Sequence, residues 1–469
     1  MPNLVELDNK NFHNPKYVFD GNVSSYKVIR TKIIRFFSFL QQENLLSKDK
    51  IAIYGDCTED YLACIITAYL LGITFVPLSR ETPIERIRYI LNEIQEDFVI
   101  NTTNDFLNLD NIKIYNNIFY NKINDQIYRS KRTSIMYIIY TSGSSGTPKG
   151  VQISYNSFEN FVKGLPECFN ICNKTRFLFH SSIMFDISLL ESIIAILYGS
   201  EIVAISSKFK KNYRRISADI MKYNVNTVFF TPSQLYLLRM FDKSLSFLKQ
   251  CDYVLIGGEN PEEELVNCLL KNHSYKLINL YGPTESTIFT HFSELKGDII
   301  DISNKMPGIN YFLEKKDVSR VNKNYCYEIV IEGNQLYSGY VHEGKKNISQ
   351  YRTGDLVQIC EGKMIFYGRI DNQIKLNGNR IEIEEIEISI IKTGLVERCT
   401  VIVKNSSLIA YYVNDREIER EEIINCLKNK LPDYMVPRKY IKVKDLPLST
   451  NGKKRRLFED KSIQKDIVL

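Results

Sequence analysis

Apolar runs alternate with amphipathic stretches along the first 130 residues of the chain. Residues 51–54 and 97–101 have the pattern of short buried strands, whereas residues 61–71 and 83–94 carry apolar side chains at helical spacing. Gly72 follows the first of these helical stretches, at a position where helices commonly end. Strands that alternate with helices predict a mainly parallel sheet, so the pattern indicates an α/β fold.

The pattern changes close to Gly368 and Asp371. Beyond this point we predict helices at residues 381–391 and 417–430, and strands at 400–403 and 408–413. This order of elements is typical of a small α+β domain of the usual size. We therefore expect two domains, at residues 1–369 and 370–469.

The composition is that of a globular protein able to bury large cores, with 469 residues of which 44% are hydrophobic. The 61 basic and 55 acidic residues nearly balance, which gives no electrostatic reason to expect nucleic acid as a partner. The ten cysteines include no Cys-x-x-Cys pair, so we expect reduced thiols. Residues 1–10 lack the apolar core of a signal peptide, and the apolar stretch at 187–198 is too short to span a bilayer. These features predict a cytoplasmic small-molecule enzyme that does not bind membranes.

A predicted strand at residues 137–140 leads directly into a loop of glycines, hydroxyls and one lysine. Glycines let the backbone approach an anion, while the hydroxyls, the amides and the lysine can all donate to it. We expect a phosphate chain to bind here, at Thr141, Ser142, Gly143, Ser144, Ser145, Gly146, Thr147 and Lys149. The spacing differs from that of the ATPase P-loop, because Gly150 rather than Ser or Thr follows the lysine. A flexible linker is the alternative, but linkers rarely lie between an apolar run and an amphipathic one.

Further predicted strands end in residues suited to a cleft. Residues 253–256 are followed by Gly257, Gly258 and Glu259, and residues 277–280 by a turn that contains Tyr281, Thr284 and Glu285. An aromatic ring, a hydroxyl and a carboxylate suit adenine stacking, phosphate binding and Mg²⁺ coordination respectively. A purely structural turn is the alternative interpretation.

Asp186 is a lone acid inside the apolar stretch 179–190. A buried carboxylate needs a partner. It can serve as the N-cap of a helix at residues 187–197, or as the counter-ion of a cationic substrate.

Together these motifs resemble the adenylate-forming superfamily, which includes amino-acid adenylation domains, acyl-CoA synthetases and luciferases. The resemblance covers nearly the whole chain, from Leu71 to Lys453, in family order. It implies an α/β fold with a large N-terminal domain of layered α/β sheets plus a distorted β-barrel, and a small mobile C-terminal α+β domain. The sequence Phe185-Asp186-Ile187-Ser188 resembles the motif of amino-acid-activating domains, in which the aspartate holds the α-amino group. The resemblance therefore favours the counter-ion interpretation of Asp186.

The resemblance also implies roles in binding ATP and Mg²⁺. Besides the phosphate loop, the nucleotide contacts are expected at Gly258, Glu259, Tyr281, Asp355 and Arg369, with Asp355 on the ribose hydroxyls and Glu285 on the metal. Lys453 matches the catalytic lysine and acts with Thr284 and Glu285 on the phosphates. The family usually follows this lysine with a neutral residue and Asp-Arg, whereas this chain has Lys454, Arg455 and Arg456.

The expected substrate follows from the residues that the resemblance places around its side chain, namely Asp186, Ile187, Leu190, Phe229, Leu255, Gly257, Leu280, Ile288 and Phe289. One acid with bulky apolar walls describes a pocket for an α-amino acid with little or no side chain. Glycine is expected first and alanine second, since one methyl group changes binding by only about 1 to 3 kcal/mol in an apolar pocket. D-alanine is less favoured, because the D-alanine ligases carry a cysteine in place of Gly257.

The expected function is that of an ATP-dependent, AMP-forming amino-acid:carrier-protein ligase. After adenylate formation, the C-terminal domain is expected to rotate about Asp371 and present a loop containing Gly378 to the phosphopantetheine thiol. No carrier domain is recognised in the sequence, so a separate carrier protein is the expected partner. An acyl- or aryl-CoA synthetase and a catalytically idle nucleotide-binding scaffold are the alternatives. Asp186 argues against the first of these, and the presence of Lys453, Glu285 and Asp355 against the second.

Overall fold

The structure is a computed structural model that describes residues 16–116, 118–119, 133–271, 274–297, 299–316, 326–404, 407–414 and 418–446. Lys453 and its motif lie outside the described residues, so the role of this lysine stays a prediction. The chain forms two compact units, the first of residues 1–80, 91–140 and 150–370 and the second of residues 81–90, 141–149 and 371–469. Among the described helices, none has the length and apolar character needed to cross a membrane.

The expected fold class is confirmed, because sheets covered by helices build the first unit. The larger sheet has nine strands in the order β15-β14-β13-β12-β11-β9-β10-β1-β2. These strands are β1 (Lys16–Phe19), β2 (Asn22–Ser25), β9 (Arg176–Phe179), β10 (Glu201–Ala204), β11 (Thr227–Phe230), β12 (Tyr253–Gly257), β13 (Lys276–Tyr281), β14 (His291–Leu295) and β15 (Asn304–Lys305). The neighbours β9, β11, β12 and β13 pair in parallel. Their carboxyl ends therefore share one edge of the sheet.

The second sheet of this unit has six strands in the order β6-β5-β3-β4-β7-β8, with β6 to β7 in parallel. These strands are β3 (Lys50–Gly55), β4 (Thr74–Ser79), β5 (Phe98–Asn101), β6 (Lys113–Tyr115), β7 (Ile135–Thr141) and β8 (Lys149–Ser154). The accompanying helices are α2 (Tyr26–Gln42), α3 (Glu59–Leu71), α4 (Ile84–Ile94) and α5 (Tyr155–Gly164). The strands and helices predicted near the start of the chain are thus present. Helix α3 starts where the Thr58 hydroxyl accepts from the Tyr61 amide, and it ends at Gly72 with φ of +77°.

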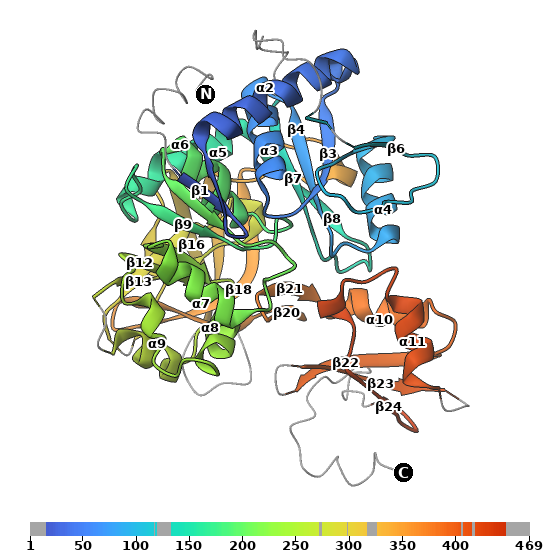
Figure 1. Cartoon of the computed structure of the whole chain (residues 1–469). Coiled ribbons are helices and arrows are strands. Elements are labelled where there is room, and N and C mark those ends of the chain that lie inside the picture. Colours follow the sequence, from blue (N-terminus) through green and yellow to red (C-terminus); the bar gives the residue numbers. More distant parts are fainter. Residues whose placement is uncertain are drawn as a thin grey trace. The chain divides into compact units, whose positions relative to one another are not determined.

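Helices cover one face of the nine-stranded sheet, and the other face packs into the large core. Helices α7 (Tyr213–Lys222), α8 (Pro232–Arg239) and α9 (Glu263–Leu270) bury Ile216, Leu235 and Leu265 in a cluster that includes Val228 and Val254 of the sheet. Figure 1 shows these three helices in the green part of the chain. The large core contains side chains of α2, α3 and α5 together with Phe229, Leu255 and Leu280 of the other face.

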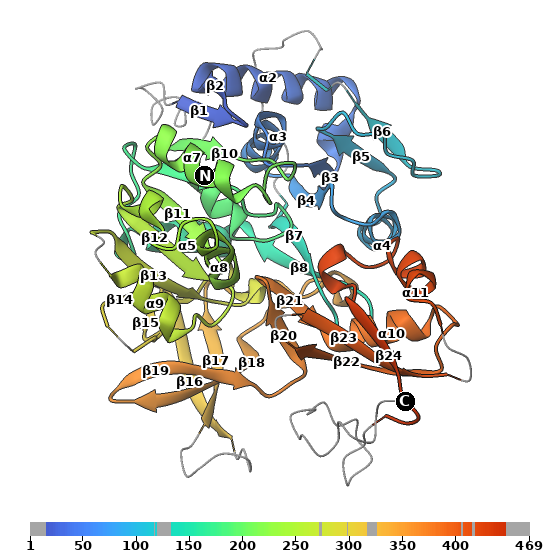
Figure 2. The same cartoon turned by 60° about the horizontal axis from the view of Figure 1, so that its bottom comes forward.

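The resemblance implied a distorted β-barrel, and in this part of the chain the structure has a separate antiparallel sheet. Its strands are β16 (Ile309–Lys316), β17 (Cys326–Gly333), β18 (Gln350–Cys360) and β19 (Lys363–Arg369), in that order. Figure 2 shows the four strands together in the yellow and orange part of the chain. The β18–β19 register places Asp355 opposite Arg369, so sheet pairing brings two of the predicted nucleotide contacts together.

The described residues after Ile370 include two small sheets and two α-helices. The elements are β20 (Gln373–Leu376), β21 (Asn379–Glu382), α10 (Ile383–Ile391), β22 (Arg398–Lys404), β23 (Ser407–Val413), α11 (Arg420–Leu427) and β24 (Lys439–Lys442). Helix α10 begins two residues later than predicted, because residues 379–382 pair with β20 instead. Both helices pack on the three-stranded sheet β22-β23-β24 through one apolar cluster (Figures 1 and 2).

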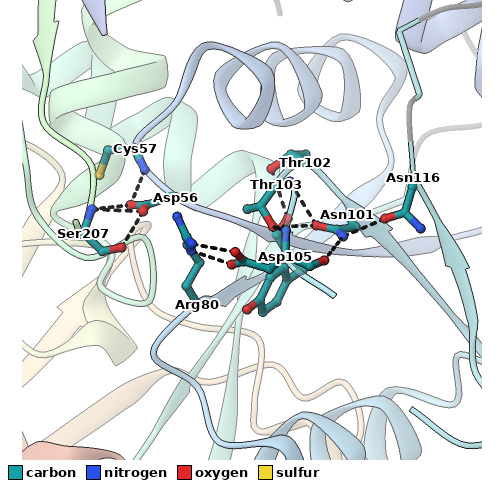
Figure 3. Close-up of polar contacts among 10 residues, drawn as sticks. Asp56, Cys57, Arg80, Asn101, Thr102, Thr103, Asp105, Asn116 and Ser207 are labelled. Atoms are coloured by element: carbon teal, nitrogen blue, oxygen red, sulfur yellow. Dashed lines mark hydrogen bonds and ion pairs between the residues drawn. The ribbon is translucent and has the colours of Figure 1, made fainter. Parts of the chain in front are cut away.

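Polar side chains at the carboxyl ends of β3, β4 and β5 hold the loops that follow these strands (Figure 3). The Asp56 carboxylate accepts from the Cys57 amide at 2.8 Å and from the Ser207 amide at 2.9 Å. The Arg80 guanidinium pairs with Asp105, beyond β5. Because Ser207 follows β10 of the nine-stranded sheet, Asp56 connects the loops of the two sheets.

We expect Asp56→Ala to lower the free energy of unfolding by about 1 to 3 kcal/mol, because it leaves the amides of Cys57 and Ser207 without their acceptor. The midpoint of urea denaturation, followed by circular dichroism, measures this loss. Asp97→Ala is the control, since the Asp97 side chain is 84% exposed and its removal should change stability by less than about 0.5 kcal/mol. Equal midpoints for the two variants would contradict this account of Asp56.

Candidate functional site

The residues predicted to surround the substrate come together at one edge of the nine-stranded sheet. Strands β11, β12 and β13 supply Phe229, Leu255 with Gly257, and Leu280. The loop after β9 supplies Asp186, Ile187 and Leu190, and the segment after β13 supplies Ile288 and Phe289. The apolar side chains among them belong to one continuous cluster. Sequence motifs that lie a hundred residues apart therefore meet at this edge.

The apolar part of this candidate pocket is tightly filled. A Cβ atom added to Gly257 would lie 2.7 Å from the Leu280 carbonyl oxygen and 3.3 Å from Cε2 of Phe229. No side chain fits at position 257 without moving one of these neighbours. Phe289 packs edge-on against Phe161, with the ring centres 5.0 Å apart. The side chains around Gly257 and Phe289 are therefore closely packed.

Asp186 is the one charged residue among the nine predicted to surround the substrate. Its residue is 8% exposed, and its Oδ2 atom accepts no hydrogen bond from any described residue. Burial raises the pKa of this carboxyl to about 7, while the backbone amides of Ile288 and Ile187 and the Thr284 hydroxyl act in the opposite direction. A buried carboxylate with an open oxygen is suited to an ammonium group.

The structure does not support the N-cap interpretation of Asp186. The amides of Ser188 and Leu189, from which an N-cap side chain would accept, donate to the backbone carbonyls of Phe185 and Asp186. The chain then enters a π-helix at Leu190–Ile194, followed by the short helix α6 (Ala195–Leu197), where we expected one α-helix. The carboxylate is therefore available for a ligand.

The segment opposite Asp186 has an unusual backbone. Thr287 and Ile288 have φ of +63° and +68°, in the left-handed region that β-branched residues rarely adopt. The Thr287 hydroxyl donates to the Gln335 carbonyl oxygen at 2.6 Å, which holds the turn in place. This conformation brings the Ile288 amide to the Asp186 carboxylate. Strain of this kind is commonly found at ligand sites, and no motif in the sequence indicated it.

Among the predicted nucleotide contacts, Tyr281 and Arg369 both bind the Asp355 carboxylate. The Tyr281 hydroxyl donates to Asp355 Oδ2 at 2.6 Å, and Arg369 pairs with Oδ1 of the same carboxylate. Arg369 also donates to the Thr353 carbonyl oxygen at 3.0 Å. Burial, followed by the charge of Asp355, raises the pKa of Tyr281, so the phenol stays a donor. Asp355 of β18 is thereby fixed in orientation beside Tyr281, the last residue of β13.

Thr284 and Glu285 lie in a 3₁₀ turn, Thr284–Ser286, directly after β13. Glu285 is buried, and its Oε1 accepts from the Tyr340 hydroxyl at 2.9 Å. Tyr340 was not among the predicted site residues, because this contact joins positions 55 residues apart in the chain. Glu259 accepts from the Ser233 hydroxyl at 2.6 Å, and Gly258 before it has φ of +80°.

The predicted phosphate loop belongs to the second compact unit. Lys149 donates to the Ser144 hydroxyl at 3.2 Å, and the hydroxyls of Ser145 and Thr147 lie 3.1 Å apart. The Gly143 amide donates to Glu385 Oε2 at 3.0 Å. This carboxylate oxygen occupies the position at which we expect a phosphate oxygen of the ligand. The loop therefore presents an amide suited to an anion. Glu385 was not among the predicted site residues.

Two further predicted positions lie at turns of the second unit. Asp371 is its first residue after the long segment of the first unit, and it accepts from the Gln373 amide at 3.2 Å. Gly378 and Asn377 occupy the two-residue turn between β20 and β21, with φ of +76° and +51°. The roles of Asp371 as a hinge and Gly378 in thiol transfer stay predictions.

Comparison with known proteins identifies relatives over nearly the whole chain. The family model described as AMP-binding enzyme matches residues 7–341, and the model described as AMP-binding enzyme C-terminal domain matches residues 385–453. Zwittermicin A synthase ZmaJ of Bacillus cereus is 27% identical over 93% of this chain and 90% of its own length. The D-alanine–D-alanyl carrier protein ligase of Listeria monocytogenes is 29% identical over 94% of both chains. The Vibrio cholerae adenylation domain AlmE has a TM-score of 0.80 at 19% identity, over 98% of this chain and 96% of its own, which supports the fold.

We expect Tyr281→Phe to weaken ATP binding about tenfold, because the ring is kept while Asp355 loses a charge-assisted hydrogen bond. Titration of ATP by calorimetry measures this change. Tyr275→Phe is a matched control, since its buried hydroxyl donates to the Leu269 carbonyl oxygen at 2.7 Å in a different cluster. Unchanged ATP affinity in Tyr281→Phe would show that Asp355 does not depend on this contact.

Proposed function

Because this chain belongs to the family of AMP-binding enzymes, we propose that it activates a small α-amino acid as an aminoacyl-adenylate. The chain is an AMP-forming ligase. In the second half-reaction it transfers the aminoacyl group to the phosphopantetheine thiol of a separate carrier protein. Relatives named as carrier protein ligases support this partner.

The observation that carries the proposal is the buried Asp186 carboxylate with its open Oδ2 atom. An α-ammonium group supplies the missing partner and the opposite charge. A fatty or aromatic acid without an amino group would leave this carboxylate buried and unpaired, which is costly. Asp186 therefore favours an amino acid over the substrate of an acyl- or aryl-CoA synthetase.

The size of the pocket favours glycine first and alanine second. Leu280 and Phe229 pack closely against Gly257. In the proposed pocket these two side chains occupy the volume that a leucine or phenylalanine substrate needs. D-alanine stays less favoured, although the relatives include D-alanine ligases, because the resemblance places a cysteine of those ligases where this chain has Gly257. The related adenylation domain AlmE is described in complex with glycyl-adenosine-5'-phosphate, which agrees with a glycine substrate.

The proposed handling of ATP assigns a separate task to each group. The loop of residues 141–149 binds the phosphates, Tyr281 stacks on the adenine, and Asp355 with Arg369 holds the ribose. The substrate carboxylate attacks the α-phosphate, the bond from the α-phosphate to the β-phosphate breaks, and pyrophosphate leaves. Lys453 neutralises the charge that develops on the phosphate oxygens, and the Thr284 hydroxyl donates to them.

Glu285 fits a bound Mg²⁺, because this ion commonly takes one or two protein carboxylates together with phosphate oxygens. No cluster of three or more His, Cys, Asp or Glu side chains suited to a metal occurs among the described residues, so phosphates would complete the ligand set. When bound, Mg²⁺ neutralises charge on the phosphate oxygens.

For the second half-reaction we propose functional domains at residues 1–369 and 370–469, with Asp371 as the hinge. A change in the orientation of the second domain would move Lys453 away from the phosphates. It would also present the Gly378 turn to the incoming thiol.

Amino-acid-dependent exchange of pyrophosphate into ATP, measured across the common amino acids, tests the first half-reaction. We expect glycine to give the highest rate, with alanine second. Loading of a phosphopantetheinylated carrier protein, compared with free coenzyme A, tests the second. Exchange with a large, charged or non-amino carboxylate in place of glycine would contradict the proposal, and preferred transfer to coenzyme A would favour the synthetase alternative.

The pKa of Asp186 predicts a pH dependence for amino-acid binding. Only the ionised carboxylate attracts an ammonium group, so the amino-acid kcat/KM should fall about tenfold for each pH unit below about 7. The KM for ATP should change far less over the same range. Asp186→Asn should lose most amino-acid-dependent exchange and show no such slope. A flat wild-type profile between about pH 5.5 and 8 would contradict this role of Asp186.

Opening the pocket should change the choice of substrate. Leu280→Ala removes a side chain that is only 5% exposed, and we expect kcat/KM for valine or leucine relative to glycine to rise at least tenfold. Leu277→Ala is the matched control, because Leu277 lies on the same strand but in the other apolar cluster. Both variants lose stability through the cavity they create. An equal shift in preference for both would show that Leu280 does not line the pocket.

A further inference from the structure

Glu191 is a completely buried carboxyl group that the proposed chemistry does not use. It lies in the π-helix Leu190–Ile194, an element that is rare and often found at functional positions. A buried acid of this kind is costly unless other groups hydrogen-bond to it. Its position therefore calls for an explanation beyond packing.

The Glu191 side chain reaches back to the end of β9. Its Oε2 accepts from the amides of His180 at 3.2 Å and Ser181 at 2.9 Å, and its Oε1 accepts from the Ser181 hydroxyl at 2.8 Å. Lys210 lies nearby and donates to the Ser181 carbonyl oxygen at 3.4 Å. One carboxylate thus satisfies both of the first amides after the strand.

These contacts close the loop that carries Asp186. The loop starts at His180 and returns at Glu191, with Asp186 about midway between them. Inside it, the backbone bonds of Phe185, Ser188 and Leu189 are turns that connect the loop only to itself. Apart from the contacts of Asp186 with the Ile288 amide and the Thr284 hydroxyl, the position of the loop on the sheet therefore depends on its two ends.

The same cluster contacts a wall of the pocket. The His180 ring nitrogen Nε2 lies 2.8 Å from the Phe229 carbonyl oxygen, and burial lowers the pKa of this histidine to about 4, so the ring stays neutral. Glu191 therefore holds the residue that fixes Phe229 as well as the loop of Asp186. Both sides of the amino-acid site are connected through this one carboxylate.

We propose that Glu191 is a positioning residue for the amino-acid site, which closes the loop His180–Glu191 and so places Asp186 against the substrate ammonium group. The inference rests on the proposed activation of an amino acid. It assigns Glu191 no contact with substrate or ATP.

Glu191→Gln tests this inference, because it keeps the shape of the side chain but replaces one acceptor oxygen with an amide that cannot accept. In pyrophosphate exchange we expect the KM for glycine to rise about tenfold while the KM for ATP stays within about twofold. Glu387→Gln is the matched control: Glu387 is also buried and accepts from the Val401 amide at 2.9 Å and the Thr400 hydroxyl at 3.1 Å, in the second unit. It should leave the KM for glycine unchanged.

The outcomes separate the inference from the function on which it rests. If wild-type protein catalyses no exchange with any amino acid, the proposed function is wrong. If the wild type is active and Glu191→Gln changes both KM values equally, or neither, the positioning role is wrong. Ser181→Ala removes only the hydroxyl contact, so it keeps the test decisive if Glu191→Gln does not fold. A smaller rise in the KM for glycine supports the inference, and an unchanged value overturns it.

Discussion

A carboxylate buried in an apolar cluster is stable only when other groups supply its hydrogen bonds and opposite charge, and the candidate site is arranged around this constraint at Asp186. The Ile187 and Ile288 amides and the Thr284 hydroxyl meet part of the requirement, and the open Oδ2 atom leaves the rest to a ligand. The strained backbone at Thr287 and Ile288 is a cost of bringing an amide to this position. In the proposed function the substrate ammonium group supplies the opposite charge, which would give the site a preference for amino acids.

Parallel strands make this arrangement possible. Four neighbouring strands, β9, β11, β12 and β13, end at the same edge of the sheet. Each of them contributes residues to the candidate site. The loop after β9 carries the acid, β11 and β12 carry the walls, and Tyr281 at the end of β13 turns towards Asp355. A rigid sheet therefore positions groups that have no contact in the sequence.

Hydrogen bonds from neighbouring residues hold the predicted functional side chains in place. Tyr340 orients Glu285, Arg369 orients Asp355, and Glu191 closes the loop of Asp186. Such supporting contacts fix geometry within a fraction of an ångström, which acyl transfer through an adenylate requires. The proposed selectivity for a small side chain would have a different origin, namely the contacts of Leu280 and Phe229 with the backbone at Gly257.

The sequence by itself determined the fold class, the order of the first strands and helices, and the motifs, because apolar periodicity and local turn chemistry are properties of neighbouring residues. It also indicated Asp186, since a lone acid in an apolar stretch is visible without a structure. Other features were decided only by the tertiary structure. The left-handed backbone at Thr287, held by Gln335, and the contact of Tyr340 with Glu285 depend on segments that are distant in the chain. The π-helix at Glu191 and the hairpin of residues 379–382 with β20 are closer contacts that the periodicity did not predict. Local propensity carries no information about such partners, so packing alone selects these conformations.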